Sequence, residues 1–264
     1  MTQDKGLVKG ERRRVRQAIH WAFILWAVFS TLWLANSVRT QGLPQGVLKS
    51  SDRVRVTEQD NWLRLQPQGA EQEASVLFIC GSGIAASAYV PMLRPLAEQG
   101  FSVYILNLPW RFAPLGSHKE QALDQAQRLL NQDQGKWLVA GHSLGGALAA
   151  RLAAQVPDKV DSLALIATTH PKRQDLSDLP MPVIKVYGSE DGIAPVQKIQ
   201  ANRHLLPAAA RFEAIEGANH SQFGHYGHQL FDGEAGISRQ QQQARTRAIL
   251  LQALAGLAGM REQT

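Results

Sequence analysis

The most constraining feature of the sequence is a serine flanked by glycines, Gly141-His-Ser143-Leu-Gly145, at the junction of two differently patterned segments. The apolar run 137–140 precedes it and predicts a buried strand, and the segment 144–156, rich in alanine and leucine, predicts a helix. Glycines on both sides of a serine permit a sharp, strained turn in which larger side chains would clash. The pattern predicts a strand–turn–helix unit that lifts the Ser143 hydroxyl above a sheet; the plain alternative is an ordinary serine in a tight turn.

Apolar runs alternate with helical segments along most of the chain. Two further runs, 54–57 and 62–65, flank the polar residues 58–61 and predict an antiparallel hairpin. The alternation predicts an α/β fold, a mostly parallel sheet with helices on both faces, in one domain over residues 52–264. The predicted strands after the hairpin are 75–80, 101–106, 137–140, 162–167, 183–187 and 211–215, and the predicted helices are about 86–99, 117–132, 144–156, 195–206 and 238–258.

A serine is a poor nucleophile near neutral pH unless a base takes its proton, and a carboxylate commonly orients that base. Asp191 and His220 each follow a predicted strand. Because the carboxyl ends of parallel strands meet at one edge of a sheet, we expect Ser143, Asp191 and His220 to converge there as nucleophile, orienting acid and general base. Glu190 is the alternative acid. The backbone N–H of Leu144, directly after the serine, is the expected donor to an oxyanion.

These residues resemble the α/β-hydrolase superfamily. The likeness covers nearly all of residues 52–264 and rests on the turn 141–145, on Gly188-Ser-Glu-Asp191 and on Gly217-Ala-Asn-His220. It implies the α/β-hydrolase fold and the roles of nucleophile, acid and base given above. The segments 219–229, 232–233 and 237–242 are similar to a bacterial branch of dienelactone-hydrolase-like proteins.

The resemblance has further implications for the site. It implies a second oxyanion donor, the backbone N–H of Ser82, in a loop where Cys80 stands in place of the histidine of many relatives. The segment 170–180 is too short for the cap that relatives often insert there, so we expect no large cap domain and an open pocket. The proposed chemistry needs no metal and no organic cofactor.

For the other histidines the sequence predicts roles outside the triad. His142 is expected to pack or to form a hydrogen bond rather than to act as a second base. His170 is expected either at the mouth of the pocket or in solvent. His220, His225 and His228 with Asp232 match no zinc-ligand spacing, so no metal site is predicted.

The N-terminal part differs in composition from the rest. A basic segment, residues 1–17, precedes an uncharged apolar run of 18 residues, 18–35, which as a helix would span roughly 27 Å, enough for a bilayer core. We expect a transmembrane signal anchor, a linker at 36–51 and, by the positive-inside rule, a cytoplasmic N-terminus with the main domain outside the cytoplasm. The alternatives are a cleaved signal peptide, which exports the domain, and a buried core helix.

The charge distribution argues against a nucleic-acid partner. The formal net charge is +6, and residues 1–16 contribute +4 of it through six basic and two acidic residues. The rest of the chain is close to neutral, which disfavours a basic groove for phosphate backbones. We therefore expect a membrane-anchored serine hydrolase that cleaves a carboxylic ester or lactone of a small or acyl-bearing substrate. An acyltransferase with the same triad and a non-catalytic binding module on this scaffold are the alternatives.

Overall fold

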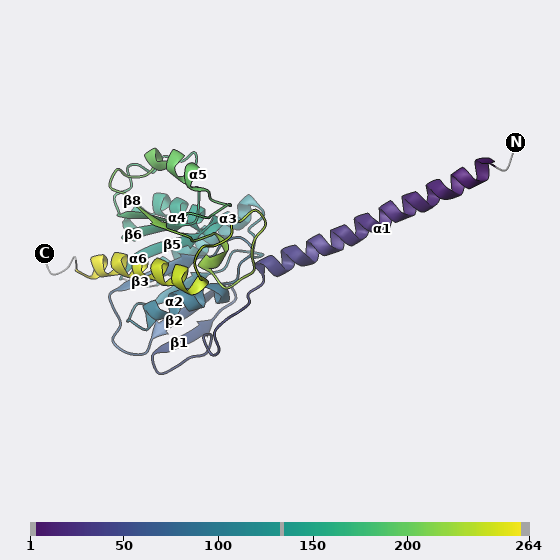
Figure 1. Cartoon of the computed structure of the whole chain (residues 1–264). Helices are drawn as coiled ribbons and strands as arrows, with labels where there is room; N and C mark the ends of the chain where they lie inside the picture. The colour runs from purple at the N-terminus through teal and green to yellow at the C-terminus, as the bar shows by residue number, and fades with distance from the viewer. Residues whose placement is uncertain (1–3, 133–134, 260–264) are drawn as a thin grey trace.

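The computed structural model describes residues 4–132 and 135–259 (Figure 1). Its centre is an eight-stranded sheet with the strand order β1-β2-β4-β3-β5-β6-β7-β8. The hairpin β1–β2 is antiparallel and joins the edge of β4, and the remaining neighbours are parallel, which confirms the predicted α/β sheet. The strands are β1 (Val54–Glu58), β2 (Trp62–Pro67), β3 (Ala74–Ile79), β4 (Val103–Leu106), β5 (Lys136–His142), β6 (Ser162–Ile166), β7 (Val183–Gly188) and β8 (Arg211–Ile215).

Helices cover both faces of the sheet. Helices α2 and α6 pack on one face, and α3 and α4 pack on the other, so the inner strands are buried on both sides and are mostly apolar. The helices are α1 (Asp4–Val38), α2 (Val90–Ala97), α3 (Gly116–Leu130), α4 (Leu144–Gln155), α5 (Val196–Ala201) and α6 (Arg239–Gly259), with short 3₁₀ turns at Ala86–Tyr89, Pro157–Lys159, Arg203–Leu205 and Ser221–Phe223.

The loops that follow the carboxyl ends of β3 to β8 gather at one edge of the sheet. The turn from β5 into α4 and the loops after β7 and β8 are among them. The connection from β6 to β7, residues 167–182, contains neither helix nor strand. The absence of a large cap domain, expected from the shortness of this segment, is therefore confirmed, and the edge is not roofed by an inserted domain.

Helix α1 extends away from the domain (Figure 1). Its stretch Arg13–Val38 is 26 residues long, is apolar enough to cross a membrane and has none of its apolar window buried against the domain. The helix starts before the predicted apolar run 18–35 because the preceding residues, rich in Arg and Lys, include good helix formers.

Candidate active site

Ser143 occupies a strained turn between β5 and α4. Its backbone angles are φ 55° and ψ −117°, a combination that costs energy for any residue with a side chain. Its N–H donates to the carbonyl oxygen of Ile166 at 2.9 Å, which ties the turn to the end of β6. Ser143 and Leu144 stay partly exposed, whereas the residues around them are buried. The turn thus presents the serine at the sheet edge, as the motif predicts.

Two glycines allow the turn to pack this closely. A Cβ at Gly145 would lie 2.0 Å from the carbonyl oxygen of Ile79, at the end of the neighbouring strand β3. A Cβ at Gly141 would lie 2.3 Å from the carbonyl oxygen of Gly145. No side chain fits at either position, so these glycines are required by backbone contact and not by helix or strand preference.

His220 and Asp191 form a buried pair. Nδ1 of His220 lies 2.9 Å from Oδ2 and 3.2 Å from Oδ1 of Asp191, and both residues are almost fully buried. Oδ1 of Asp191 also accepts the backbone N–H groups of Ile193 at 2.9 Å and Ala194 at 2.6 Å. These bonds hold the carboxylate in place and leave Nε2 as the free nitrogen of the ring. The alternative acid, Glu190, is exposed, and its carboxylate accepts a hydrogen bond from the hydroxyl of Ser189 at 3.0 Å.

The pair lies beside the serine turn. The rings of His220 and His142 are 4.6 Å apart between centroids, and Ser143 directly follows His142. Among the described residues the Ser143 hydroxyl forms no hydrogen bond. The sequence-predicted residues Ser143, Asp191 and His220, 77 positions apart at their extremes, therefore meet at one edge, with the Asp191–His220 contact formed and the serine next to it.

His142 has a structural partner of its own. Its Nδ1 lies 2.9 Å from the hydroxyl of Tyr89, which also accepts the backbone N–H of Gly81 at 3.1 Å. Burial lowers the pKa of His142 well below its usual value, so the ring stays neutral. Tyr89 thereby links the serine turn to the loop after β3. The sequence carried no signal for this link, because the two residues are 53 positions apart.

The two backbone N–H groups that we expect to act as oxyanion donors, those of Ser82 and Leu144, follow β3 and Ser143. In the loop after β3, the N–H of Gly81 is bound by Tyr89 and the N–H of Gly83 donates to the carbonyl oxygen of Arg111 at 2.7 Å. Within the described part of the chain, the N–H groups of Ser82 and Leu144 donate to no other group, so they are free to hold an anion. Cys80, below this loop, is fully buried, and burial raises the pKa of its thiol.

Asp232 and Tyr226 hold the backbone of His220, a role that sequence reasoning missed. Oδ1 of Asp232 accepts the N–H of His220 at 3.0 Å, and Oδ2 accepts the N–H and hydroxyl of Ser221 at 2.7 and 2.6 Å. The hydroxyl of Tyr226 donates to the carbonyl oxygen of His220 at 3.0 Å. Over the described residues, no cluster of three or more histidine, cysteine or acidic side chains is arranged to hold a metal ion. The resemblance of the segments 219–229 and 232–233 to a bacterial branch was the signal in the sequence that pointed to Tyr226 and Asp232.

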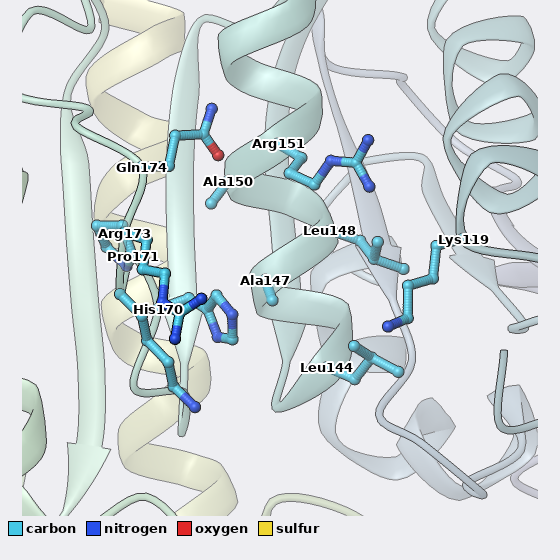
Figure 2. Close-up of a pocket in the computed structure, with 11 residues that line it drawn as sticks. Lys119, Leu144, Ala147, Leu148, Ala150, Arg151, His170, Pro171, Arg173 and Gln174 are labelled. Carbon is cyan, nitrogen blue, oxygen red and sulfur yellow. The ribbon is translucent and has the colours of Figure 1, made fainter. Parts of the chain in front are cut away.

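A cavity of about 440 Å³ begins at Leu144 and runs along the outer side of α4 (Figure 2). Figure 2 shows His170 and Arg173 on one side of the helix and Lys119 on the other. Burial, with the charges of Lys172, Lys185 and Lys119, lowers the pKa of His170 to about 4, so this ring is neutral at pH 7. The cavity is lined by Lys119, Leu144, Ala147, Leu148, Ala150, Arg151, His170, Pro171, Lys172, Arg173 and Gln174.

The cavity is strongly cationic. Arg151 is paired with Glu120 at 2.9 Å, whereas Lys119, Lys172 and Arg173 have no acidic partner among the described residues. His170 lines this cavity and is only partly exposed, and neither Ser143 nor His220 is among the lining residues. The side chain of Leu144, whose N–H is an expected oxyanion donor, forms its end nearest the serine.

Lys185 is a buried base under the same loop. It lies on β7 with 2% of its surface exposed, and its Nζ donates to the carbonyl oxygen of His170. Burial lowers the pKa of this amine to about 7, because the charged form loses its hydration. At pH 7 the folded protein therefore carries an amine that is close to half-neutral, while the unfolded chain carries it charged.

Replacing Lys185 by methionine is expected to raise the free energy of unfolding, most at low pH. Below pH 7 the Lys185 amine is charged in both states, and its burial lowers the free energy of unfolding of the wild type. This loss of stability shrinks as the pH rises from about 7, the pKa in the folded protein, towards 10.5, the pKa in the unfolded chain. After allowance for the lost hydrogen bond, the gain in Lys185→Met is about 3 kcal/mol at pH 6 and under about 1 kcal/mol at pH 10. Urea titrations at several pH values measure it, with exposed Lys198→Met as the control. A gain independent of pH would contradict the assignment.

Comparisons with known proteins agree with this fold. A model of the alpha/beta hydrolase family matches residues 75–244. An α/β serine hydrolase without a lid from Xanthomonas campestris superposes with a TM-score of 0.56 and 17% identity, over 80% of this chain and 97% of that one. A dienelactone-hydrolase-like protein from Klebsiella pneumoniae has a TM-score of 0.50 and 16% identity, over 73% and 91% of the two chains. The structural neighbours thus include dienelactone-hydrolase-like and other serine hydrolases, as the sequence resemblance predicts.

One curated relative is similar over a shorter stretch. A non-heme-haloperoxidase-like protein of Mycobacterium phage D29 is 32% identical over 98 residues. The alignment covers 35% of this chain and 35% of that protein, so the chain matches about a third of the relative's length.

Proposed function

Because the chain belongs to the alpha/beta hydrolase family, we propose that it is a serine hydrolase that cleaves a carboxylic ester or lactone through an acyl-enzyme on Ser143. The observation that carries the proposal is the buried Asp191–His220 pair, 2.9 Å between Oδ2 and Nδ1, placed beside a serine in a strained strand-to-helix turn. The free N–H groups of Ser82 and Leu144 add the site for a developing negative charge.

The geometry supports a two-step reaction. The hydroxyl oxygen of Ser143 attacks the carbonyl carbon while Nε2 of His220 takes its proton, and the carbonyl oxygen becomes an anion held by the N–H groups of Ser82 and Leu144. The imidazolium, stabilised by Asp191, then protonates the departing alkoxide. Water, deprotonated by the same nitrogen, attacks the acyl-enzyme and releases the acid and the serine. For a lactone the alkoxide stays attached to the acyl group.

The proposal is tested with the purified full chain and chromogenic esters of graded acyl length. We expect turnover of at least one ester and covalent labelling by a fluorophosphonate probe at Ser143, located by peptide mass spectrometry. Absence of both would overturn it and favour a binding module on this scaffold. Product analysis with added alcohols or amines separates hydrolysis from acyl transfer, since a transferase would form the new ester or amide in preference to the acid.

The cationic cavity narrows the substrate class. It starts at Leu144, next to the proposed oxyanion position, and carries three cations without acidic partners among the described residues, Lys119, Lys172 and Arg173. An ester with a carboxylate or phosphate on one arm would place that group among them while its carbonyl lies at Ser143. We therefore propose a preference for anionic esters over neutral esters of the same size.

The double variant Lys119→Gln/Arg173→Gln is expected to lose this preference. The ratio of kcat/KM for an anionic ester to that for its neutral amide-capped analogue should fall about tenfold, a modest effect because Lys119 is partly exposed and Arg173 is exposed to water. Lys198→Gln on α5, outside the cavity, is the matched control and should keep the wild-type ratio. An unchanged ratio in the double variant would assign the cavity no role in substrate choice.

The N-terminal helix α1 is the proposed membrane anchor of the protein. Its length and apolar surface suit an uncleaved signal anchor. We propose a cytoplasmic segment at 1–17, a span at 18–35, a linker at 36–51 and a hydrolase domain at 52–264 outside the cytoplasm. Protease protection of right-side-out vesicles tests this orientation, and N-terminal sequencing of the membrane-extracted protein tests the alternative of signal cleavage.

A further inference from the structure

Exposed apolar side chains are confined to one part of the hydrolase domain. Outside α1, the large hydrophobic residues exposed in the described chain are Leu48, Trp110, Phe112, Leu115, Ile193, Leu230 and Phe231. All but Leu48 lie in loops after the carboxyl ends of parallel strands, at the edge that holds Ser143 and His220. We call these six residues the apolar rim. A gathering of this kind around a site marks a surface that meets something apolar.

The loops that carry the rim adjoin two parts of the candidate site. On one side, the hydroxyl of Ser82 lies 3.4 Å from the carbonyl oxygen of Phe112, so the loop with Trp110 and Phe112 adjoins the oxyanion loop. On the other side, Phe231 precedes Asp232, whose carboxylate binds the N–H of His220. The loops that adjoin these two parts of the site therefore carry exposed apolar side chains.

Two of the rim residues are held outward by strained backbone. Trp110 has φ 53° and 79% exposure, and Phe231 has φ 69° and 82% exposure. Positive φ costs a bulky residue roughly 1–2 kcal/mol, and the exposed ring recovers none of that cost in water. The strain is offset if the two rings enter an apolar phase.

Helix α1 leaves the domain at this same edge. A Cβ on Gly83 of the oxyanion loop would lie 2.8 Å from the ring of Phe112 and 3.0 Å from Cγ1 of Val38, so the last residue of α1 touches the loop. Thr40 pairs with Tyr226, whose hydroxyl donates to the carbonyl oxygen of His220. The end of the apolar run, Ala35, is three residues before Val38, about 5 Å along a helix. The membrane surface is thereby brought within one helical turn of the oxyanion loop.

We propose that the apolar rim rests in the surface of the bilayer that α1 spans, and that the substrate is an acyl ester residing in that bilayer. The inference rests on the proposed hydrolase function and on α1 as a membrane anchor. The bilayer is the occupant because the last residue of α1 touches the loop beside Phe112 of the rim. A membrane-spanning α1 would therefore hold this edge near the bilayer surface, where aromatic rings favour the headgroup region. The serine then draws the ester from the membrane without its passage through water.

The contact is tested first without any enzymatic readout. Cys80, the single cysteine of the chain, is buried. A polarity-sensitive fluorophore that reacts with thiols will therefore label a cysteine introduced at the surface. In full-length protein reconstituted into phosphatidylcholine vesicles, a nitrobenzoxadiazole label on Leu115→Cys should shift to shorter emission wavelength and be quenched by nitroxide lipids. A label on Leu48→Cys, the exposed apolar residue outside the rim, should show neither change. Equal, water-like emission at both positions would overturn the proposal.

The second test asks whether the contact delivers substrate. Asparagine tolerates positive φ, so Trp110→Asn/Phe231→Asn removes both rings at little backbone cost. In the same vesicles, kcat/KM for a long-chain ester embedded in the bilayer should fall about tenfold, relative to kcat/KM for a short water-soluble ester. Leu48→Asn should leave that ratio unchanged. An unchanged ratio in the double variant would overturn the delivery of substrate from the bilayer.

The outcomes separate the two proposals. Membrane insertion of the Leu115 label with no turnover of either ester would refute the hydrolase and with it the bilayer substrate, while the docked orientation would stand. Turnover of the soluble ester, with water-like emission at Leu115, would keep the hydrolase and refute the docked orientation.

Discussion

Replacement of Ser143 by alanine is expected to lower ester turnover by roughly 10³- to 10⁶-fold, because the variant keeps the oxyanion donors and binding surfaces but has no nucleophile. The hydroxyl forms no hydrogen bond among the described residues, so its removal leaves no buried group unpaired. The strained φ of 55° is retained, since alanine is subject to the same backbone limits as serine. Initial rates with the best chromogenic ester, together with the loss of fluorophosphonate labelling, measure the effect.

Ser82→Ala is the matched control for this variant. Ser82 is proposed to act through its backbone N–H, which alanine keeps, and its hydroxyl makes only a 3.4 Å contact with the carbonyl oxygen of Phe112. We expect it to retain most of the wild-type rate and to fold normally by circular dichroism. A Ser143→Ala protein that is folded and as active as wild type would refute the acyl-enzyme mechanism, whatever the behaviour of Ser82→Ala.

Replacement of Gly145 by alanine is expected to destabilise the protein by more than about 4 kcal/mol, or to prevent folding. The added Cβ would lie 2.0 Å from the carbonyl oxygen of Ile79 and 2.5 Å from that of Cys80, and both contacts are backbone atoms of the sheet edge that cannot rotate away. The start of α4 would have to move off β3, which displaces Ser143 and Leu144. Urea unfolding of purified protein, or the soluble yield where none is purified, measures the loss.

Gly256→Ala, also a glycine-to-alanine change within a helix, is expected to have the opposite effect on stability. Gly256 lies in α6 with open space around its Cβ position, so alanine there should stabilise the protein by roughly 0.5–1 kcal/mol through helix propensity. The contrast isolates backbone contact as the cause, because helix propensity alone favours alanine at both positions. Equal stabilisation by the two variants would contradict the close approach of α4 to β3.

Much of the fold was predictable because its signals are local. The hairpin β1–β2, the buried strands and the helix after Ser143 follow from apolar periodicity and turn residues, and their boundaries differ from the predictions by only a few positions. The choice between Glu190 and Asp191 was not local. Both are acidic residues in one turn, and only the loop geometry that exposes the first and buries the second beside His220 separates them.

The sequence by itself determined the fold class, the strained turn at Ser143, the apolar helix and the candidate residues Ser143, Asp191 and His220, because each was recognised from a short local pattern of residues. The tertiary structure alone decided the link from Tyr89 to His142, the support of His220 by Asp232, the cationic cavity along α4 and the exit of α1 beside the oxyanion loop. These join residues far apart in the chain, and their contacts depend on how the loops meet at the sheet edge, which no local pattern of residues encodes.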